Sequence, residues 1–143
     1  MAVDLDHSFS TDKPLDESFT AIIDLERVIP AVEGGRVLEK TGDDSAKAEI
    51  LVKMGAMSLT FTGTVEVAEK DEAEHRALLK VRSREKRGQG YANADVEFKL
   101  NDSGGEIHTH AQITGKAASM GEGVVVSVLD ALIKDFTGKL ATL

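Results

Sequence analysis

The chain has 143 residues, a formal net charge of −8 and a hydrophobic fraction of 41%. This length and apolar content suit a single domain, residues 1–143, with its own core, and they exclude a disordered chain. Cysteine is absent, which excludes disulfides, thiolate nucleophiles and cysteine-ligated metals, while the acidic balance argues against nucleic acid as a partner.

The N-terminal segment predicts a strand followed by two short helices. Residues 3–9 alternate between apolar and polar side chains, as in a strand with one buried face. Asp12 and Pro14 are the predicted cap and early proline of a first helix. A second helical turn, Leu25 to Val28, is expected to end near Pro30, because the residue before a proline disfavours the α conformation. No signal peptide is recognisable in this segment, so we expect a cytoplasmic protein.

From Gly34 onward, polar turn clusters separate segments in which every second residue is apolar. Such segments predict an antiparallel meander with one face exposed to water. Gly55 and Gly63 interrupt apolar strands and are predicted bends or bulges that curl the sheet. The residues assigned to the buried face are Ala48, Ile50, Val52, Met54, Met57, Leu59, Phe61, Val65, Val67, His75, Ala77, Leu79, Val81, Ala92, Ala94, Val96, Phe98, Leu100, Ile107, Thr109, Ala111 and Ile113.

The last segment has helical periodicity. A helix of about 24 residues, roughly 36 Å long, is expected to begin at Ser119 or at the glycine turn before it. A helix lying on a membrane surface is the alternative, although its charges are mixed rather than basic. Its apolar stripe and the apolar sheet face must cover each other, which predicts an α+β fold: a curved antiparallel sheet of about seven strands around a long C-terminal helix. The stripe comprises Met120, Val124, Val125, Val128, Leu129, Leu132, Ile133, Phe136 and Leu140.

Three short motifs occur in order along nearly the whole chain. They are Asp24 to Pro30 (DLERVIP), Lys53 to Gly55 followed by Phe61 to Val65 (KMG and FTGTV), and Gly104-Gly105 followed by Gly115 to Gly121 (GKAASMG). With the order of elements, these motifs resemble the START-like, birch-pollen-allergen-like (SRPBCC) superfamily, and within it the CoxG family, which is named for a subunit of carbon monoxide dehydrogenase. Some members carry a C-terminal extension associated with membrane attachment; this chain stops at Leu143, so membrane contact lacks that support.

The resemblance implies a helix-grip fold with a cavity between the sheet and the last helix. Such a cavity would accept an apolar small molecule of the quinone or lipid class. The protein would then act as a carrier or accessory subunit of a redox enzyme such as carbon monoxide dehydrogenase, with a molybdenum-type dehydrogenase complex as its partner. A cyclase- or hydrolase-type enzyme of the same superfamily and a scaffolding subunit without ligand remain alternatives.

The candidate ligand-binding residues lie where the concave sheet face meets the last helix. They are Met54, Met57, Leu59, Phe61, Val96, Phe98, Val124, Val128 and Leu132, and plain core packing is the alternative for each. His7 and His75 also fall on predicted apolar faces. Each is either a hydrogen-bonded core histidine or a polar contact for a ligand carbonyl or hydroxyl.

We predict no catalytic residue, no cofactor and no metal site. His108 and His110 share the strand face opposite Ile107 and are expected to point to water, and a metal site would need further ligands. Serines lie outside any nucleophile-elbow motif. The basic stretch Lys80, Arg82, Arg84, Lys86 and Arg87 is interpreted as a solvated strand end and turn, with a patch for an anionic partner as the alternative.

Overall fold

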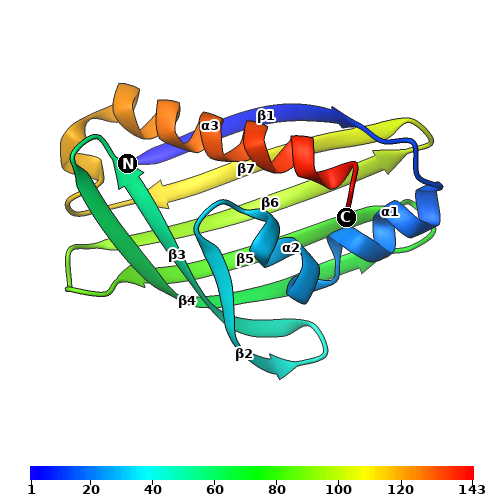
Figure 1. Ribbon diagram of the computed structural model, residues 1–143, viewed down its shortest axis with the longest axis horizontal. Coiled ribbons are helices and arrows are strands. Elements are labelled where there is room, and N and C mark those ends of the chain that lie inside the picture. Colours follow the sequence, from blue (N-terminus) through cyan, green and yellow to red (C-terminus); the bar gives the residue numbers. More distant parts are fainter.

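The computed structural model describes all residues 1–143, and it has the predicted α+β architecture. One antiparallel sheet of seven strands curves around a long C-terminal helix, and two short helices follow the first strand (Figure 1). The elements are β1 (Ala2–Ser10), α1 (Leu15–Ile22), α2 (Leu25–Ala31), β2 (Gly35–Gly42), β3 (Ser45–Met54), β4 (Met57–Asp71), β5 (Arg76–Glu85), β6 (Tyr91–Asn101), β7 (Gly104–Ile113), a 3-10 turn (Ala118–Met120) and α3 (Glu122–Leu140).

The strand order places the first and second strands at opposite edges of the sheet. The order is β1-β7-β6-β5-β4-β3-β2, so consecutive strands pair except where α1 and α2 carry the chain from β1 to β2. Helix α3 packs against β1, while α2 packs against β2 and also touches β3 and β4 (Figure 1). The two helical groups therefore meet the concave face from opposite edges.

The core divides into two clusters along α3. Near the start of the helix, Val125 packs with Leu59 and Phe61 of β4. Near its end, Phe136 packs with Phe98 of β6 in an edge-on arrangement of the rings, with centroids 6.3 Å apart. The helix is thus anchored at both ends by buried apolar side chains, and its middle lies between the two anchors.

Several predicted boundaries are wrong. Asp12 does not cap α1: Pro14 holds the N-cap position, with no side-chain cap. Helix α2, by contrast, begins at Leu25 and ends at Ala31, one residue after Pro30, close to the predicted end. Helix α3 has 19 residues and begins at Glu122, because Gly121, with φ 97°, breaks it from the preceding 3-10 turn.

The two glycines predicted to be bulges have other roles. Gly55 lies in the turn between β3 and β4 with φ 66°, a left-handed conformation that favours glycine. Gly63 sits in regular register, and a Cβ there would lie 1.9 Å from the Arg82 carbonyl oxygen of β5. Its strand thus approaches the neighbouring backbone too closely for any side chain. The observed register shifts lie elsewhere, in β2 against β3 and in β4 after Val67.

A candidate ligand-binding cavity

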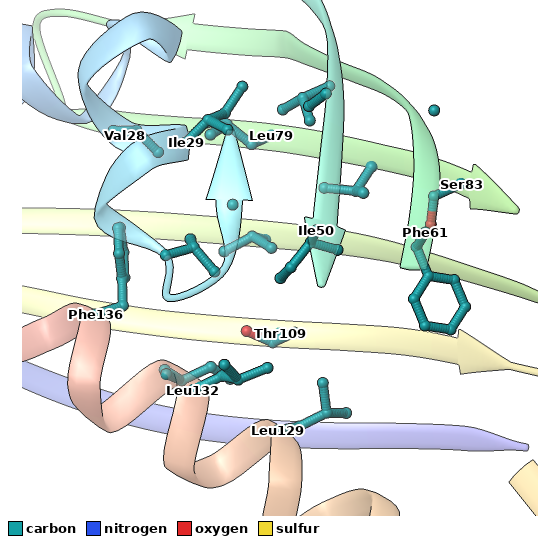
Figure 2. Close-up of a pocket in the computed structure, with 18 of the residues that line it drawn as sticks. Val28, Ile29, Ile50, Phe61, Leu79, Ser83, Thr109, Leu129, Leu132 and Phe136 are labelled. Atoms are coloured by element: carbon teal, nitrogen blue, oxygen red, sulfur yellow. The ribbon is translucent and has the colours of Figure 1, made fainter. Parts of the chain in front are cut away.

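A cavity of about 240 Å³ lies between the concave sheet face, α2 and α3. Of its 22 lining residues, 16 are hydrophobic, and every strand except β1 contributes. Figure 2 shows Val28 and Ile29 of α2 across the space from Leu132 and Phe136 of α3. The remaining lining residues are Val32, Gly35, Ala48, Glu49, Ile50, Phe61, Gly63, Thr64, Val65, Leu79, Val81, Ser83, Val96, Phe98, Ile107, Thr109, Leu129 and Ile133.

The middle of α3 faces this cavity without packing into either core cluster. Leu132 and Ile133 are half-buried, line the cavity, and belong to neither cluster. Apolar side chains in a filled interior normally contact many buried neighbours. The concave groove is therefore closed at the two anchors of α3 and remains open between them.

Two of the four polar side chains of the lining, those of Glu49 and Thr64, lie on the outer face of the sheet. Side chains alternate along a strand, so Glu49 and Thr64 point away from the cavity that Ile50 and Val65 face. The polar side chains that face inward are the hydroxyls of Ser83 and Thr109. Ser83 Oγ donates to the carbonyl of Ala92, whereas buried Thr109 Oγ1 has no hydrogen-bond partner.

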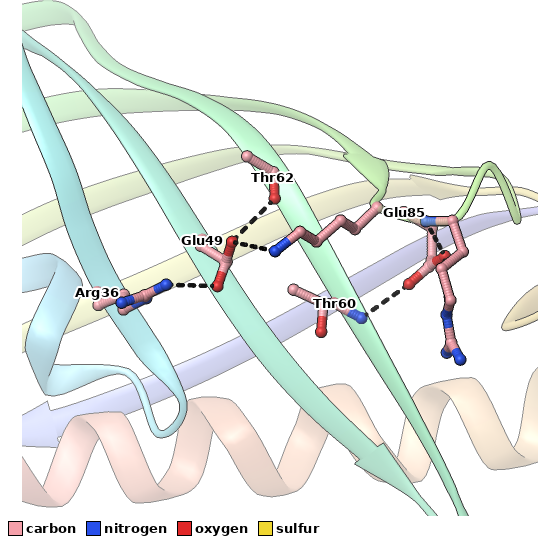
Figure 3. Close-up of polar contacts among 7 residues, drawn as sticks. Arg36, Glu49, Thr60, Thr62 and Glu85 are labelled. Carbon is pink, nitrogen blue, oxygen red and sulfur yellow. Dashed lines mark hydrogen bonds and ion pairs between the residues drawn. The ribbon is translucent and has the colours of Figure 1, made fainter.

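Polar contacts on the outer side fix the wall formed by β2, β3 and β4 (Figure 3). Glu49 accepts hydrogen bonds from Arg36 at 3.0 Å and from the Thr62 hydroxyl at 3.3 Å. The Arg36 contact is the main reason that the pKa of Glu49 lies below its usual 4.5. This carboxylate therefore joins three adjacent strands across the back of the cavity.

A buried carboxylate secures the far end of the same wall. Glu85 has a fully buried side chain, and it accepts hydrogen bonds from the backbone N–H groups of Thr60, at 3.0 Å, and Arg87, at 2.7 Å (Figure 3). The Thr60 bond is the largest cause of a pKa below the usual 4.5 for Glu85. An ionised carboxylate here closes the turn between β5 and β6 and ties it to β4.

Of the residues predicted to contact a ligand, Phe61, Val96, Phe98 and Leu132 line the cavity. The others lie outside it. Met54 and Leu59 are filled core at the N-terminal anchor of α3, and Met57 and Val128 pack against the same cluster. Val124 is 40% exposed, whereas its neighbour Val125 is buried in that cluster.

His7 and His75 each tie a helix to the sheet instead of lining the cavity. His7 Nε2 lies 2.7 Å from Asp130 Oδ1 of α3, because α3 lies directly over β1. His75 precedes β5 in a turn, with φ 52°, and its Nε2 lies 2.8 Å from Asp16 Oδ1 of α1. Its ring meets Phe19 edge-on, with centroids 5.6 Å apart.

The outer face of β1 and β7 carries a cluster of two histidines and two aspartates, which we call the outer quartet: Asp4, Asp6, His108 and His110. His108 Nδ1 lies 2.6 Å from Asp6 Oδ1, and His110 Nδ1 lies 2.9 Å from Asp4 Oδ1. His108 and His110 point away from the core as predicted, but each is paired with carboxylates. The basic stretch is likewise on the outer face, where Arg82 pairs with Asp95 of β6 at 3.0 Å.

The sequence-based prediction of ligand-binding residues missed the lining from α2 and all of that from β3, β5 and β7. Val28 and Ile29 were treated only as parts of a short helix and its motif, and Val32 was not considered, although the spacing of the three residues indicates one apolar face. Ile133 and Phe136 were placed on the apolar stripe of the last helix but were not selected as lining. They lie about two and a half and just over three turns beyond Val124, and the sequence does not show how far along the helix the cavity extends.

Seven antiparallel strands gripping a long C-terminal helix define the helix-grip class of the SRPBCC superfamily, in which the cavity lies between sheet and helix. The family model for CoxG, a subunit of carbon monoxide dehydrogenase, matches residues 8–142. The chain belongs to the CoxG family. No curated protein matches it by sequence.

Solved structures share this fold at low identity. A conserved protein from Geobacillus kaustophilus is similar with a TM-score of 0.78 and 21% identity, over 99% of this chain and 93% of that one. The Zhui aromatase/cyclase from a Streptomyces species is similar with a TM-score of 0.61 and 12% identity, over 98% of this chain and 94% of that one. The major latex-like protein from Panax ginseng is similar with a TM-score of 0.56 and 10% identity, over 96% of this chain and 97% of that one.

None of the helices of this chain combines the length and apolar character of a membrane span.

Proposed function

We propose that this protein binds an apolar small molecule of the quinone or lipid class in the cavity beneath α3. The observation that carries this proposal is the unpacked middle of that helix. Leu132 and Ile133 expose apolar surface to an interior space, and neither contributes to the two core clusters. Protein interiors are normally packed as densely as organic crystals, so a retained apolar space of this size points to a guest.

The lining chemistry supports a carrier over the cyclase or hydrolase alternative. Glu49 is the titratable residue of the lining, and its carboxylate is held on the outer face by Arg36 and Thr62. General acid–base catalysis requires a titratable group within hydrogen-bond reach of the substrate. Of the two inward-facing hydroxyls, that of Ser83 already donates to the Ala92 carbonyl, so only that of Thr109 is left to recognise a bound molecule.

The family supplies the proposed partner. We infer that the protein is an accessory subunit that presents its ligand to a redox enzyme such as carbon monoxide dehydrogenase, a molybdenum-type dehydrogenase complex, in the cytoplasm. Membership in the CoxG family supports this partner, and a chain without cysteine suits a reducing compartment. Co-purification of the tagged chain with a dehydrogenase from native cells would support it, and recovery of the chain alone would count against it.

A binding experiment with matched variants tests the ligand-binding proposal. Native mass spectrometry after mild purification detects a retained molecule, and a neutral fluorescent dye such as Nile red reports occupancy by displacement. Leu132→Glu places a charge in the apolar cavity and is expected to weaken dye binding by more than about tenfold. Val124→Glu makes the same change at an exposed site on the same helix, and binding should persist.

The variants also define the contradicting result. If the wild-type chain retains no molecule and binds neither dye nor quinone, the ligand-binding proposal is wrong. The same holds if Leu132→Glu and Val124→Glu bind the dye equally well. Circular dichroism of both variants checks that each remains folded.

A further inference from the structure

Thr109 is an unsatisfied polar group in an otherwise apolar cavity. The residue is 6% exposed, it lines the cavity from the concave face of β7, and its Oγ1 atom has no hydrogen-bond partner (Figure 2). Its cross-strand partners are Leu5 of β1 and Val96 of β6, whose side chains cannot hydrogen-bond. A buried hydroxyl without a partner is costly, so its retention in a native core calls for an explanation.

Building on the proposed function, we propose that the Thr109 hydroxyl is the polar anchor that orients the ligand, and that the ligand is a neutral apolar molecule with a carbonyl or hydroxyl group. Because Oγ1 is fully buried in the free protein, rotation about χ1 of Thr109 must first turn the hydroxyl into the cavity that the residue lines. It then donates to a carbonyl oxygen, or it donates to or accepts from a ligand hydroxyl. One hydrogen bond in a largely apolar cavity fixes orientation without requiring a charged partner.

The charges of the cavity argue against an anionic ligand such as an ionised fatty acid. No lysine, arginine or histidine lines the space, and the one charged lining residue is Glu49. An ionised carboxylate buried without a cation or several donors pays a large desolvation cost. The Thr109 hydroxyl alone would not offset that cost, so neutral guests are preferred.

Ser83 is the natural control within the same cavity. It is 8% exposed and lines the cavity from β5, but its hydroxyl already donates to the Ala92 carbonyl. A ligand gains little from a hydroxyl that already has an acceptor. Removing the Ser83 hydroxyl should therefore leave ligand discrimination unchanged, while removing that of Thr109 should alter it.

The cavity volume indicates which probes to use. An engineered apolar cavity of about 150 Å³ binds benzene, so about 240 Å³ has room for a group of one or two rings. Three probes share a naphthalene skeleton: 2-methyl-1,4-naphthoquinone, 2-methylnaphthalene and 2-naphthoate. They differ in carrying carbonyls, no polar group, or an ionised carboxylate. The chain has no cysteine, so the quinone cannot form a thiol adduct.

The experiment compares the full-length wild type with Thr109→Val, Thr109→Ser and Ser83→Ala by isothermal titration calorimetry. We expect Thr109→Val to weaken quinone binding by about threefold to tenfold and to change methylnaphthalene binding by less than about twofold. Thr109→Ser keeps the hydroxyl and should retain quinone affinity, as should Ser83→Ala. Naphthoate should bind the wild type at least about tenfold more weakly than the quinone. The free Thr109→Val protein should melt at a higher temperature than the wild type, because it no longer buries an unpaired hydroxyl.

The outcomes separate this inference from the proposed function. If none of the three probes binds, both are overturned. If the quinone and methylnaphthalene bind but Thr109→Val weakens them equally or not at all, or if naphthoate binds as tightly as the quinone, the inference alone is overturned. A lower melting temperature for Thr109→Val would show that the hydroxyl already has a partner in the free protein, and would also overturn it.

Discussion

His7 of β1 and Asp130 of α3 are joined by a contact of 2.7 Å between Nε2 and Oδ1. The His7 side chain is 8% exposed, so the contact lies between the edge strand and the helix that covers it. Asp130 follows Leu129, which lines the cavity, and lies along α3 between the anchor residues Val125 and Phe136. We expect this pair to hold the unpacked middle of the helix over the sheet.

Replacing His7 by alanine should therefore loosen α3. The loss of a buried, hydrogen-bonded side chain is expected to reduce the free energy of unfolding by about 2 kcal/mol. Amide hydrogen exchange should increase in α3 around Asp130. His75→Ala is the matched control, because it removes the equivalent tie to α1 through Asp16, and its effect should appear in α1. Unchanged exchange in α3 of His7→Ala would contradict the role of the pair.

Filling the cavity should separate binding from stability. Val96→Phe adds a ring to the half-buried lining, and we expect binding of 2-methyl-1,4-naphthoquinone to fall by more than about tenfold while the free energy of unfolding changes by less than about 1.5 kcal/mol. The comparison is Leu59→Phe, at a side chain with 0% exposure outside the cavity. Overpacking there should cost about 1–3 kcal/mol, as measured by denaturant unfolding. Equal costs at both sites would indicate that the space at Val96 is already filled.

The outer quartet should make the free energy of unfolding depend on pH in two ranges, an acidic one through Asp4 and a range above pH 6.5 through His108. The pKa of Asp4 is lowered from its ordinary 3.8, chiefly by the hydrogen bond from His110, so its contribution is lost as pH falls through the lowered value. The pKa of His108 is raised above its ordinary 6.5, chiefly by its hydrogen bond to Asp6. That contribution is complete below pH 6.5 and is lost as pH rises through the raised value.

A substitution at His108 tests the upper limit. His108→Gln should reduce the fall in melting temperature between about pH 6 and pH 8.5, and NMR titration of the wild type should find the His108 pKa above 6.5. Gln112→Ala, on the outer face of β7 beside Ala2, changes no charge and should keep the wild-type pH profile. A His108 pKa at or below 6.5 would be incompatible with the proposed pairing.

Glu85→Gln should destabilise the protein at neutral pH and much less in acid. The backbone N–H groups of Thr60 and Arg87 donate to the carboxylate and lower its pKa, so its contribution is present above pH 4.5 and disappears as pH falls through the lowered value. Melting curves at about pH 7 and pH 3 should show a smaller difference between variant and wild type in acid. Glu69→Gln, at an exposed site of β4, should show no such convergence.

The sequence was sufficient for the elements and their faces. Period-two alternation in the strands and the apolar stripe of the last helix depend on local geometry, so they predict which side of each element is buried. The seven strands and the helix-grip architecture are confirmed. The helix starts predicted at Asp12 and Ser119 were wrong, because helix termini depend on tertiary contacts as well as on local preference.

The amino-acid sequence by itself determined that an apolar helix would cover an apolar sheet face, because alternation and stripe are periodic properties of a chain. Only the tertiary structure decided where the space between α3 and the sheet is filled by side chains and where it forms a cavity. Leu59 of the strand alternation and Leu132 of the helical stripe were both predicted to contact a ligand, yet one is fully packed and the other lines the cavity. The difference follows from which positions pack into the two clusters at the ends of α3, and the periodicity of the chain does not specify this. The tertiary structure likewise places His7 in contact with Asp130 and leaves the Thr109 hydroxyl without a hydrogen-bond partner, because both depend on residues distant in sequence.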